Sequence, residues 1–382
     1  MTRVSVRGSV IRWAIERSGK ASAIRNTFPQ TAAWETGTAQ PTLRQLESFA
    51  KETSTPLGYL FLSAPPEERL PIPDFRTHDD RPVHRPSPDL LETVYLMQRR
   101  QDWLRDFLEQ QGEDPLPFVG SARSADPPEE VARKMRDVLG LSCRWAAGCR
   151  TWTDALAQLR RTIEDRGVVV VVNGIVGNNT HRKLDPNEFR GFVLVDEHAP
   201  LVFINGADSK AAQMFTLMHE LAHVWLGKSA AFDLRELEPS HEPSEQACNR
   251  IAAEFLVPKQ ELTEFWSRAK EEADPIQTVA REFKVSALVA ARRARDLKLV
   301  RPADFSRFYR RYEEGERQKR KAPRGGDFYA TQNLRLGRPF GEAVVRAVKE
   351  GKLSYSEAYR LTGLYGTAFH RYSAQLHGRT DA

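Results

Sequence analysis

The sequence predicts an α+β protein that is mainly helical, with a small mixed β-sheet near its middle and an all-α module before it. Short runs of β-branched and aromatic residues at Val168–Val172, Phe189–Val195 and Leu201–Asn205 are typical of strands. Most other segments have apolar residues at helical spacing, and clusters of proline separate them because proline ends a helix. A few short strands among many helices indicate one small sheet covered by helices.

The chain is long enough for several domains. Its 382 residues exceed what one hydrophobic core usually spans, so we expect roughly two to three domains. The proline-rich stretch from Pro65 to Pro73 closes a helical module over residues 1–65, and connecting helices follow over residues 66–149. The sheet and two helices form a middle domain over residues 150–300. A basic linker and a tail of one or two helices occupy residues 301–382.

The helices of the middle part are expected in a definite order. Connecting helices lie near residues 88–111 and 129–139, and an amphipathic helix near 152–165 precedes the first strand. After the third strand Ser209 has the side chain of a helix N-cap, and the helical pattern runs to Leu226 and stops at Gly227. Another helix extends from Pro243 to Leu256 and stops before a proline.

The composition is that of a globular protein. Hydrophobic residues make up 40% and charged residues 28% of the chain, which excludes a mainly disordered protein. The net charge of +6 permits nucleic-acid contact without requiring it. Three cysteines and an N-terminus without an apolar leader predict a cytoplasmic protein. The longest apolar run, Val168–Val172, is too short for a membrane span, so no membrane partner is expected.

The segment Thr216–Gly227 carries the most informative chemistry. His219 and His223 are four residues apart on a helical segment, so both imidazoles project from one face roughly 6 Å apart and can bind one Zn²⁺. Glu220 lies beside that face, where it can accept the proton of a water molecule that attacks a carbonyl and pass it to the leaving amine. The pattern predicts a zinc peptidase, and the alternative is a pair of core histidines on a buried helix.

A catalytic zinc needs three protein ligands and an open position. Glu245 is the preferred third ligand, because it begins a helix whose alanines allow close approach to the histidine helix. Glu254 lies on the same helix, and a solvent-facing role is expected for it. His241 is either a fourth ligand or a residue without a metal role. The other acids downstream of the motif are Asp233, Glu236, Glu238 and Glu242.

These residues resemble the ImmA/IrrE family of zinc metallopeptidases, and the resemblance covers about residues 150 to 300. The matching stretches are Gly191–Asp196, Pro200–Asn205, His219–Gly227 and Glu245–Pro258. The resemblance implies a zincin-like metallopeptidase fold, metal ligation by His219, His223 and Glu245, and a general-base role for Glu220. It also implies a substrate class, a DNA-binding repressor or antitoxin, and a regulatory role in a phage-like, toxin-antitoxin or stress-response locus.

The segment before Pro65 resembles the Xre-type helix-turn-helix domain that often precedes this peptidase. Its helices are expected at Arg12–Gly19, Ala23–Phe28 and Gln30–Gly37. Gln30 and Thr31 are the candidates for base contacts, and Arg25 and Arg44 are the nearest cations for DNA phosphates. Cations are few in this module, so a degenerate domain that dimerises or holds a protein partner is the alternative.

The sequence also allows other functions. The main alternative is a DNA-binding transcriptional regulator or antitoxin with a structural or vestigial zinc site. A non-catalytic scaffold is weaker, because a scaffold has no use for a base beside a metal. The basic segments Ile276–Leu297 and Arg307–Arg324 are interpreted as packed or linker segments with solvated arginines, or as nucleic-acid contacts. The sequence does not indicate the oligomeric state.

Overall fold

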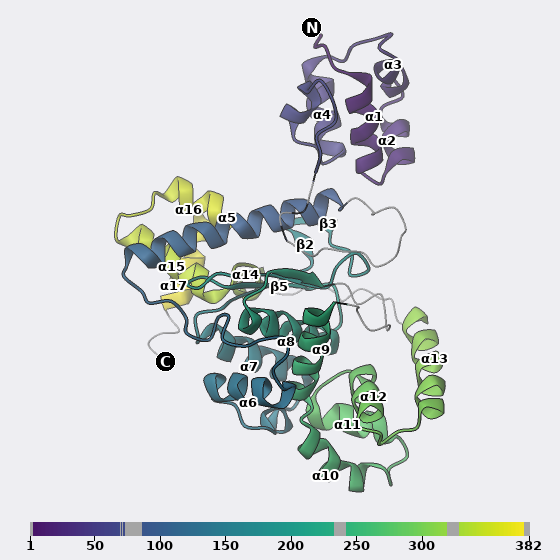
Figure 1. Ribbon diagram of the computed structural model, residues 1–382. Helices are drawn as coiled ribbons and strands as arrows, with labels where there is room; N and C mark the ends of the chain where they lie inside the picture. The colour runs from purple at the N-terminus through teal and green to yellow at the C-terminus, as the bar shows by residue number, and fades with distance from the viewer. Residues whose placement is uncertain are drawn as a thin grey trace. The chain divides into compact units, whose positions relative to one another are not determined.

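A computed structural model of the chain describes residues 3–68, 70, 72, 86–232, 242–318 and 328–377. The chain forms two compact units, residues 1–96 and 97–382, and the division falls within helix α5 (Pro88–Gln110). The described residues are mainly helical with a small mixed sheet, which confirms the α+β class (Figure 1). Their helices fall short of the length and apolar character that crossing a membrane requires.

The first unit begins with short helices around an aromatic core. Trp34 and Phe49 are buried and meet edge to face, with 5.9 Å between ring centroids. The helices predicted before Pro65 are present, and the first begins at Gly8 rather than at Arg12. The elements are α1 (Gly8–Arg17), α2 (Ala21–Thr27), α3 (Thr31–Thr36), α4 (Leu43–Glu52) and the 3₁₀ helix η1 (Leu57–Phe61).

The second unit is built on a four-stranded mixed sheet. Its strands lie in the order β1-β5-β4-β6. β1 and β5 are parallel, with Val169 opposite Leu201, and β4 runs antiparallel to both β5 and β6. The three predicted strands are present and completely buried. The strands are β1 (Val169–Asn173), β4 (Gly191–Leu194), β5 (Leu201–Asn205) and β6 (Ala230–Phe232).

A separate antiparallel hairpin follows β1. It consists of β2 (Ile175–Val176) and β3 (Asn179–Lys183). The sequence did not predict it, because β3 has a polar, exposed sequence without the alternation that marks a half-buried strand.

The helices of the second unit cover both faces of the sheet (Figure 1). α7 and α8 pack on one face, where Val193 and Val202 join the main core. α5 lies on the other side, and Gln101 donates from it to the carbonyls of Leu194 and Ala199. The helices that follow α5 are α6 (Pro128–Leu139), α7 (Trp152–Glu164), α8 (Lys210–Leu226), α9 (Pro243–Leu256), α10 (Lys259–Ala269), α11 (Pro275–Phe283), α12 (Ala287–Asp296) and α13 (Pro302–Gln318), with the 3₁₀ helix η2 (Trp145–Gly148) before α7.

The C-terminal segment differs from the expected one or two helices. Its described residues form four helices, α14 (Phe328–Leu336), α15 (Arg338–Lys349), α16 (Tyr355–Thr362) and α17 (Thr367–His377). α14 and α15 pack against β1. The buried Arg100 guanidinium of α5 donates to the carbonyls of Arg335, Leu361 and Thr362. These helices are therefore part of the second unit and not a loose extension of it.

Candidate metal centre

Helix α8 places the His-Glu-x-x-His segment inside the core. It begins where predicted, with the Ser209 hydroxyl accepting from the Ala212 N–H, and it ends at Gly227 with a φ of 68°. Its last carbonyls accept hydrogen bonds from the backbone of Gly120 and Ala122, which satisfies groups that a helix end leaves unpaired. The helix is therefore fixed at both ends.

Three side chains converge at the predicted site. Nε2 of His219 lies 3.1 Å from one carboxylate oxygen of Glu245, and Nε2 of His223 lies 3.1 Å from the other. The two Nε2 atoms are 3.1 Å apart. Both imidazoles are buried, and Glu245 comes from the first turn of α9, which packs closely on α8. The group has the donor types and spacing of a site for one metal ion.

Asn249 is a site residue that the sequence interpretation missed. Its side-chain oxygen lies 3.1 Å from Nδ1 of His219. Because an amide oxygen only accepts, Nδ1 carries the proton and Nε2 keeps its lone pair for the converging group. A signal was available, since Asn249 follows Glu245 by four residues and so shares its face of α9.

The electrostatics suit a cation at the point of convergence. Burial lowers the pKa of His219, which favours the neutral imidazole that a metal requires. Among the described residues, neither carboxylate oxygen of the buried Glu220 has a hydrogen-bond partner. Burial, together with the nearby Glu245 carboxylate, raises the pKa of Glu220 well above its ordinary value. A divalent cation would satisfy the converging lone pairs and favour the charged form of Glu220.

The other candidate ligands do not join this group. Glu242 precedes α9, and its carboxylate accepts from the Ser244 hydroxyl at 2.6 Å. The expectation that Glu254 faces solvent was wrong: it is 5% exposed, accepts from the Lys259 N–H and pairs with Arg293 of α12. Asp233, Glu236, Glu238 and His241 lie outside the described residues.

The basic face expected on α12 is partly used for packing. Arg293 pairs with Glu254 inside the unit, and the Arg295 guanidinium lies over the Phe305 ring, 5.0 Å from its centroid. Arg307, Arg310 and Arg311 are exposed on α13, and residues 319–324 lie outside the described residues.

The residues of the first unit that were predicted to contact DNA differ from one another in exposure and in pairing. Thr31 is buried and its hydroxyl donates to the Phe28 carbonyl, so it has no exposed surface with which to contact a base. Arg25 is paired with Glu35 at 2.7 Å. Gln30 is half-buried at the start of α3, and Arg44 is exposed on α4.

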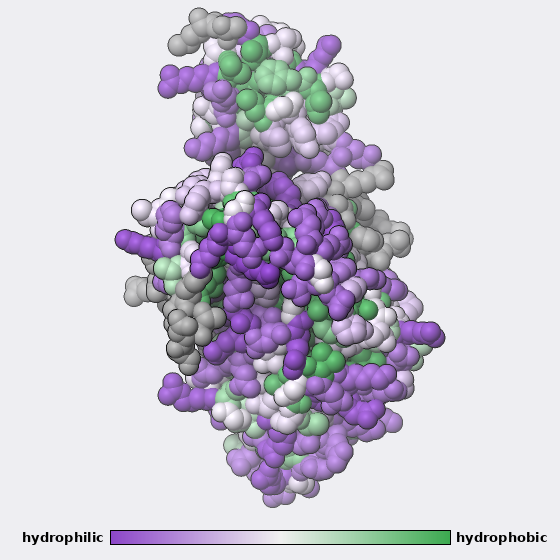
Figure 2. All heavy atoms as spheres, turned by 90° about the vertical axis from the view of Figure 1, so that its left-hand side faces the viewer, coloured by the Kyte–Doolittle hydropathy of each residue, from purple (hydrophilic) through white to green (hydrophobic). Residues whose placement is uncertain are grey.

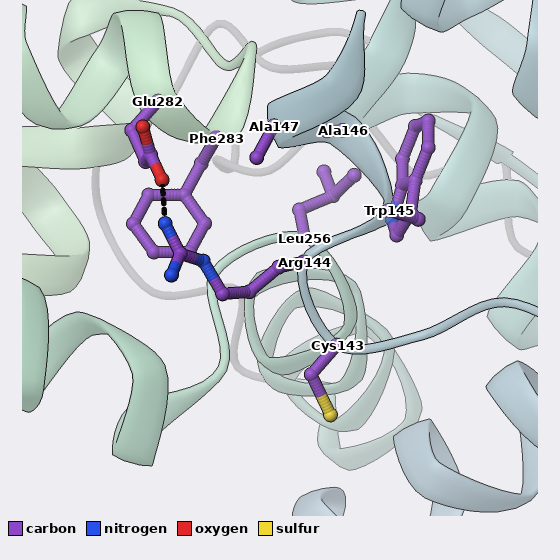
Figure 3. Close-up of a pocket in the computed structure, with 8 residues that line it drawn as sticks. All are labelled: Cys143, Arg144, Trp145, Ala146, Ala147, Leu256, Glu282 and Phe283. Carbon is purple, nitrogen blue, oxygen red and sulfur yellow. Dashed lines mark hydrogen bonds and ion pairs between the residues drawn. The ribbon is translucent and has the colours of Figure 1, made fainter.

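A small surface hollow lies beside η2, and none of the three converging side chains lines it (Figure 3). Figure 3 shows the guanidinium of Arg144 meeting the carboxylate of Glu282 across it. Its charged groups are thus already paired, and Cys143 beside them has no acid, base or metal-binding partner among the residues that line the hollow. It has no arrangement that suggests chemistry.

Comparison with known families agrees with the geometry. Residues 163–295 match the family model of the IrrE N-terminal-like domain, peptidase family M78. This match supports the ImmA/IrrE family and a metallopeptidase assignment for the part of the chain from the end of α7 to α12. Residues 336–375 match a domain of unknown function, DUF8813. No curated protein and no solved structure matched the chain.

Proposed function

We propose, on the metallopeptidase match of residues 163–295, that the chain is a zinc-dependent endopeptidase. One observation carries the proposal: two imidazole nitrogens and a carboxylate from α8 and α9 converge within 4.8 Å of one another, beside a buried glutamate without a partner among the described residues. A merely structural zinc site would not need a buried base next to it.

The donor set fits zinc. His219, His223 and Glu245 would supply two nitrogens and one oxygen, and catalytic zinc sites combine three protein ligands with one open position. A zinc ion bound there would act as a Lewis acid that polarises a peptide carbonyl and makes water more acidic.

The chain's own residues supply the proton transfers. Glu220 as a carboxylate takes the proton of the attacking water and delivers it to the amine nitrogen as the peptide bond breaks. Burial raises the pKa of Glu220, which favours its accepting a proton, and a cation at the site would offset this shift. Asn249 orients His219 by accepting a hydrogen bond from its Nδ1. The apolar residues Leu221 and Val224 of α8 are completely buried and keep bulk water out.

The proposed substrate is a DNA-binding repressor or antitoxin. Its support is the likeness to the ImmA/IrrE family, which implies substrates of this class in phage-like, toxin-antitoxin or stress-response loci. The first unit is proposed to bring the enzyme to this partner. Arg12 and Arg25 are paired with Glu35, and Thr31 is buried, which favours a protein contact over sequence-specific reading of DNA.

The test is cleavage of a repressor or antitoxin encoded next to this chain. The Glu220→Gln variant should retain zinc but lose about 10²-fold or more in cleavage rate, since it keeps the fold without a base. Glu129→Gln, at an exposed position of α6, is the matched control and should cleave like the parent. Cleavage by Glu220→Gln at the parental rate, or by parent protein freed of metal, would contradict the mechanism.

A further inference from the structure

Helices α15, α16 and α17 have an arrangement that the peptidase reaction does not use. α16 has eight residues and ends at Gly363, whose φ of 69° reverses the chain. A short turn over residues 363–366 leads into the longer α17. A short helix, a glycine turn and a longer helix packed on a third helix are the elements of a helix-turn-helix. We infer that α16, this turn and α17 form a helix-turn-helix that binds duplex DNA, with α17 in the major groove.

The core of the motif orients α17. Ala358 of α16, Leu364 of the turn, and Phe369 and Tyr372 of α17 are all almost fully buried. The Phe369 ring meets the Tyr359 ring with 5.6 Å between centroids. Because these side chains hold α17 by one face, the opposite face is directed to solvent.

The exposed face of α17 carries side chains that can read bases. The exposed positions recur at the spacing of one helical face. Thr, His, Arg and Gln side chains donate or accept hydrogen bonds at base edges, and Arg and Gln can do so with two bonds at once. Among the described residues of α17, none on this face is acidic. The residues of the face are Thr367, His370, Arg371, Ala374 and Gln375.

Further cations lie beside the turn. The β2–β3 hairpin contacts it, because the Asn178 side-chain amide donates to the Gly363 carbonyl at 3.0 Å. β3 carries exposed His181 and Lys183, and Arg360 is exposed on α16. Lys and Arg at the edge of a recognition helix are the usual contacts for DNA phosphates. The surface over α15–α17 is mainly hydrophilic, as Figure 2 shows.

The contrast with the first unit supports this assignment. In the first unit Arg12 and Arg25 both contact Glu35 of α3, and Thr31 is buried. On α16 the acidic Glu357 accepts hydrogen bonds from Ser354 in a capping box, and it also interacts electrostatically with Arg360. The second helix of the C-terminal motif therefore presents exposed polar side chains and no acid, whereas α3 of the first unit carries Glu35 and the buried Thr31.

The test uses the full chain and a fluorescent duplex of random sequence, with affinity measured by anisotropy at several salt concentrations. The double variant Arg360→Ala/Arg371→Ala should bind about 10-fold or more weakly, and the slope of log affinity against log salt should fall by about 1 to 2. Arg123→Ala/Arg133→Ala removes two exposed cations elsewhere and should bind like the parent. All variants change exposed side chains, so equal urea midpoints will verify their folding.

A selection from a random duplex pool tests base reading. The parent should enrich a sequence motif, and Gln375→Ala should relax the preference at one or two adjacent base pairs. The inference is overturned if the full chain does not bind duplex at low salt. Equal weakening of binding by both double variants would also overturn it. So would displacement of the duplex by polyglutamate together with no enriched motif, since the surface would then bind acidic polypeptides.

Discussion

At the site, the chemistry of His219 depends on a residue outside the His-Glu-x-x-His segment. Asn249 accepts a hydrogen bond from the Nδ1 N–H and so leaves the Nε2 lone pair, on the side of Glu245, free to bind a metal ion. Such outer partners fix the ring orientation and raise the basicity of a metal ligand. His223 differs, because its Nδ1 has no partner among the described residues. The two histidines should therefore contribute unequally to metal affinity.

Replacing Asn249 by alanine should weaken zinc binding about 10- to 100-fold, because His219 loses the group that holds its tautomer. Asn249→Asp keeps an acceptor for the Nδ1 proton and should retain most of the affinity. Competition with a chromophoric chelator measures both variants. An alanine variant with the parental affinity would show that Asn249 does not position His219.

At the level of secondary-structure elements, the close approach of β4 to α8 places Glu220, the proposed base. A Cβ atom at Gly191 would lie 2.7 Å from Thr216 Cγ2, 2.9 Å from the Phe203 carbonyl oxygen and 3.1 Å from a Glu220 carboxylate oxygen. Only glycine allows strand and helix to come this near. The fold therefore brings Glu220 against the backbone of the sheet.

Gly191→Ala should destabilise the protein by about 1–3 kcal/mol, since the added methyl overpacks the contact, and it should also reduce proteolysis by displacing Glu220. Gly148→Ala is the control, because a Cβ atom added there would meet nothing within 4 Å among the described residues; we expect a change of about 0.5 kcal/mol or less. Urea unfolding compares the two. Equal stability of the two variants would mean that β4 and α8 can separate at no cost.

At the scale of the whole second unit, Glu164 of α7 links the segment that matches the peptidase family, residues 163–295, to the C-terminal helices. One carboxylate oxygen accepts from the Arg338 N–H at 2.9 Å, at the start of α15, and the other pairs with Arg160 at 2.6 Å. Burial nevertheless raises the pKa of Glu164 to about 7. The junction therefore holds a proton more tightly in the folded than in the unfolded protein.

This shift predicts a pH dependence of stability. The contribution of Glu164 is fully present below the unfolded pKa of about 4.5 and is lost as pH rises through about 7, by about 3 kcal/mol in all. In Glu164→Gln this part of the pH dependence should disappear. The measurement is the difference in unfolding free energy between parent and variant from about pH 4 to pH 8. A difference that stays constant over this range would contradict the assignment, and Glu129→Gln serves as the exposed control.

Local patterns in the sequence determined much of this protein. The three buried strands, the ends of α8 at Ser209 and Gly227, and the shared face of His219 and His223 follow from short-range geometry, because strand and helix periods are properties of neighbouring residues. The acid that meets the histidines was also identified, since Glu245 begins a helix rich in alanine. Three features could not be predicted from the sequence: the burial of Glu254, the role of Asn249 and the four C-terminal helices.

Only the tertiary structure decided these latter features. Glu254 is buried because Arg293 reaches it from a helix far along the chain, and no local pattern encodes that meeting. Arg100 is buried for the same reason, since its three carbonyl partners come from the C-terminal helices. A charged side chain enters a core only where distant groups compensate it. Periodicity thus placed the candidate metal-binding side chains on their helices, while packing between distant segments decided which charged groups are inside.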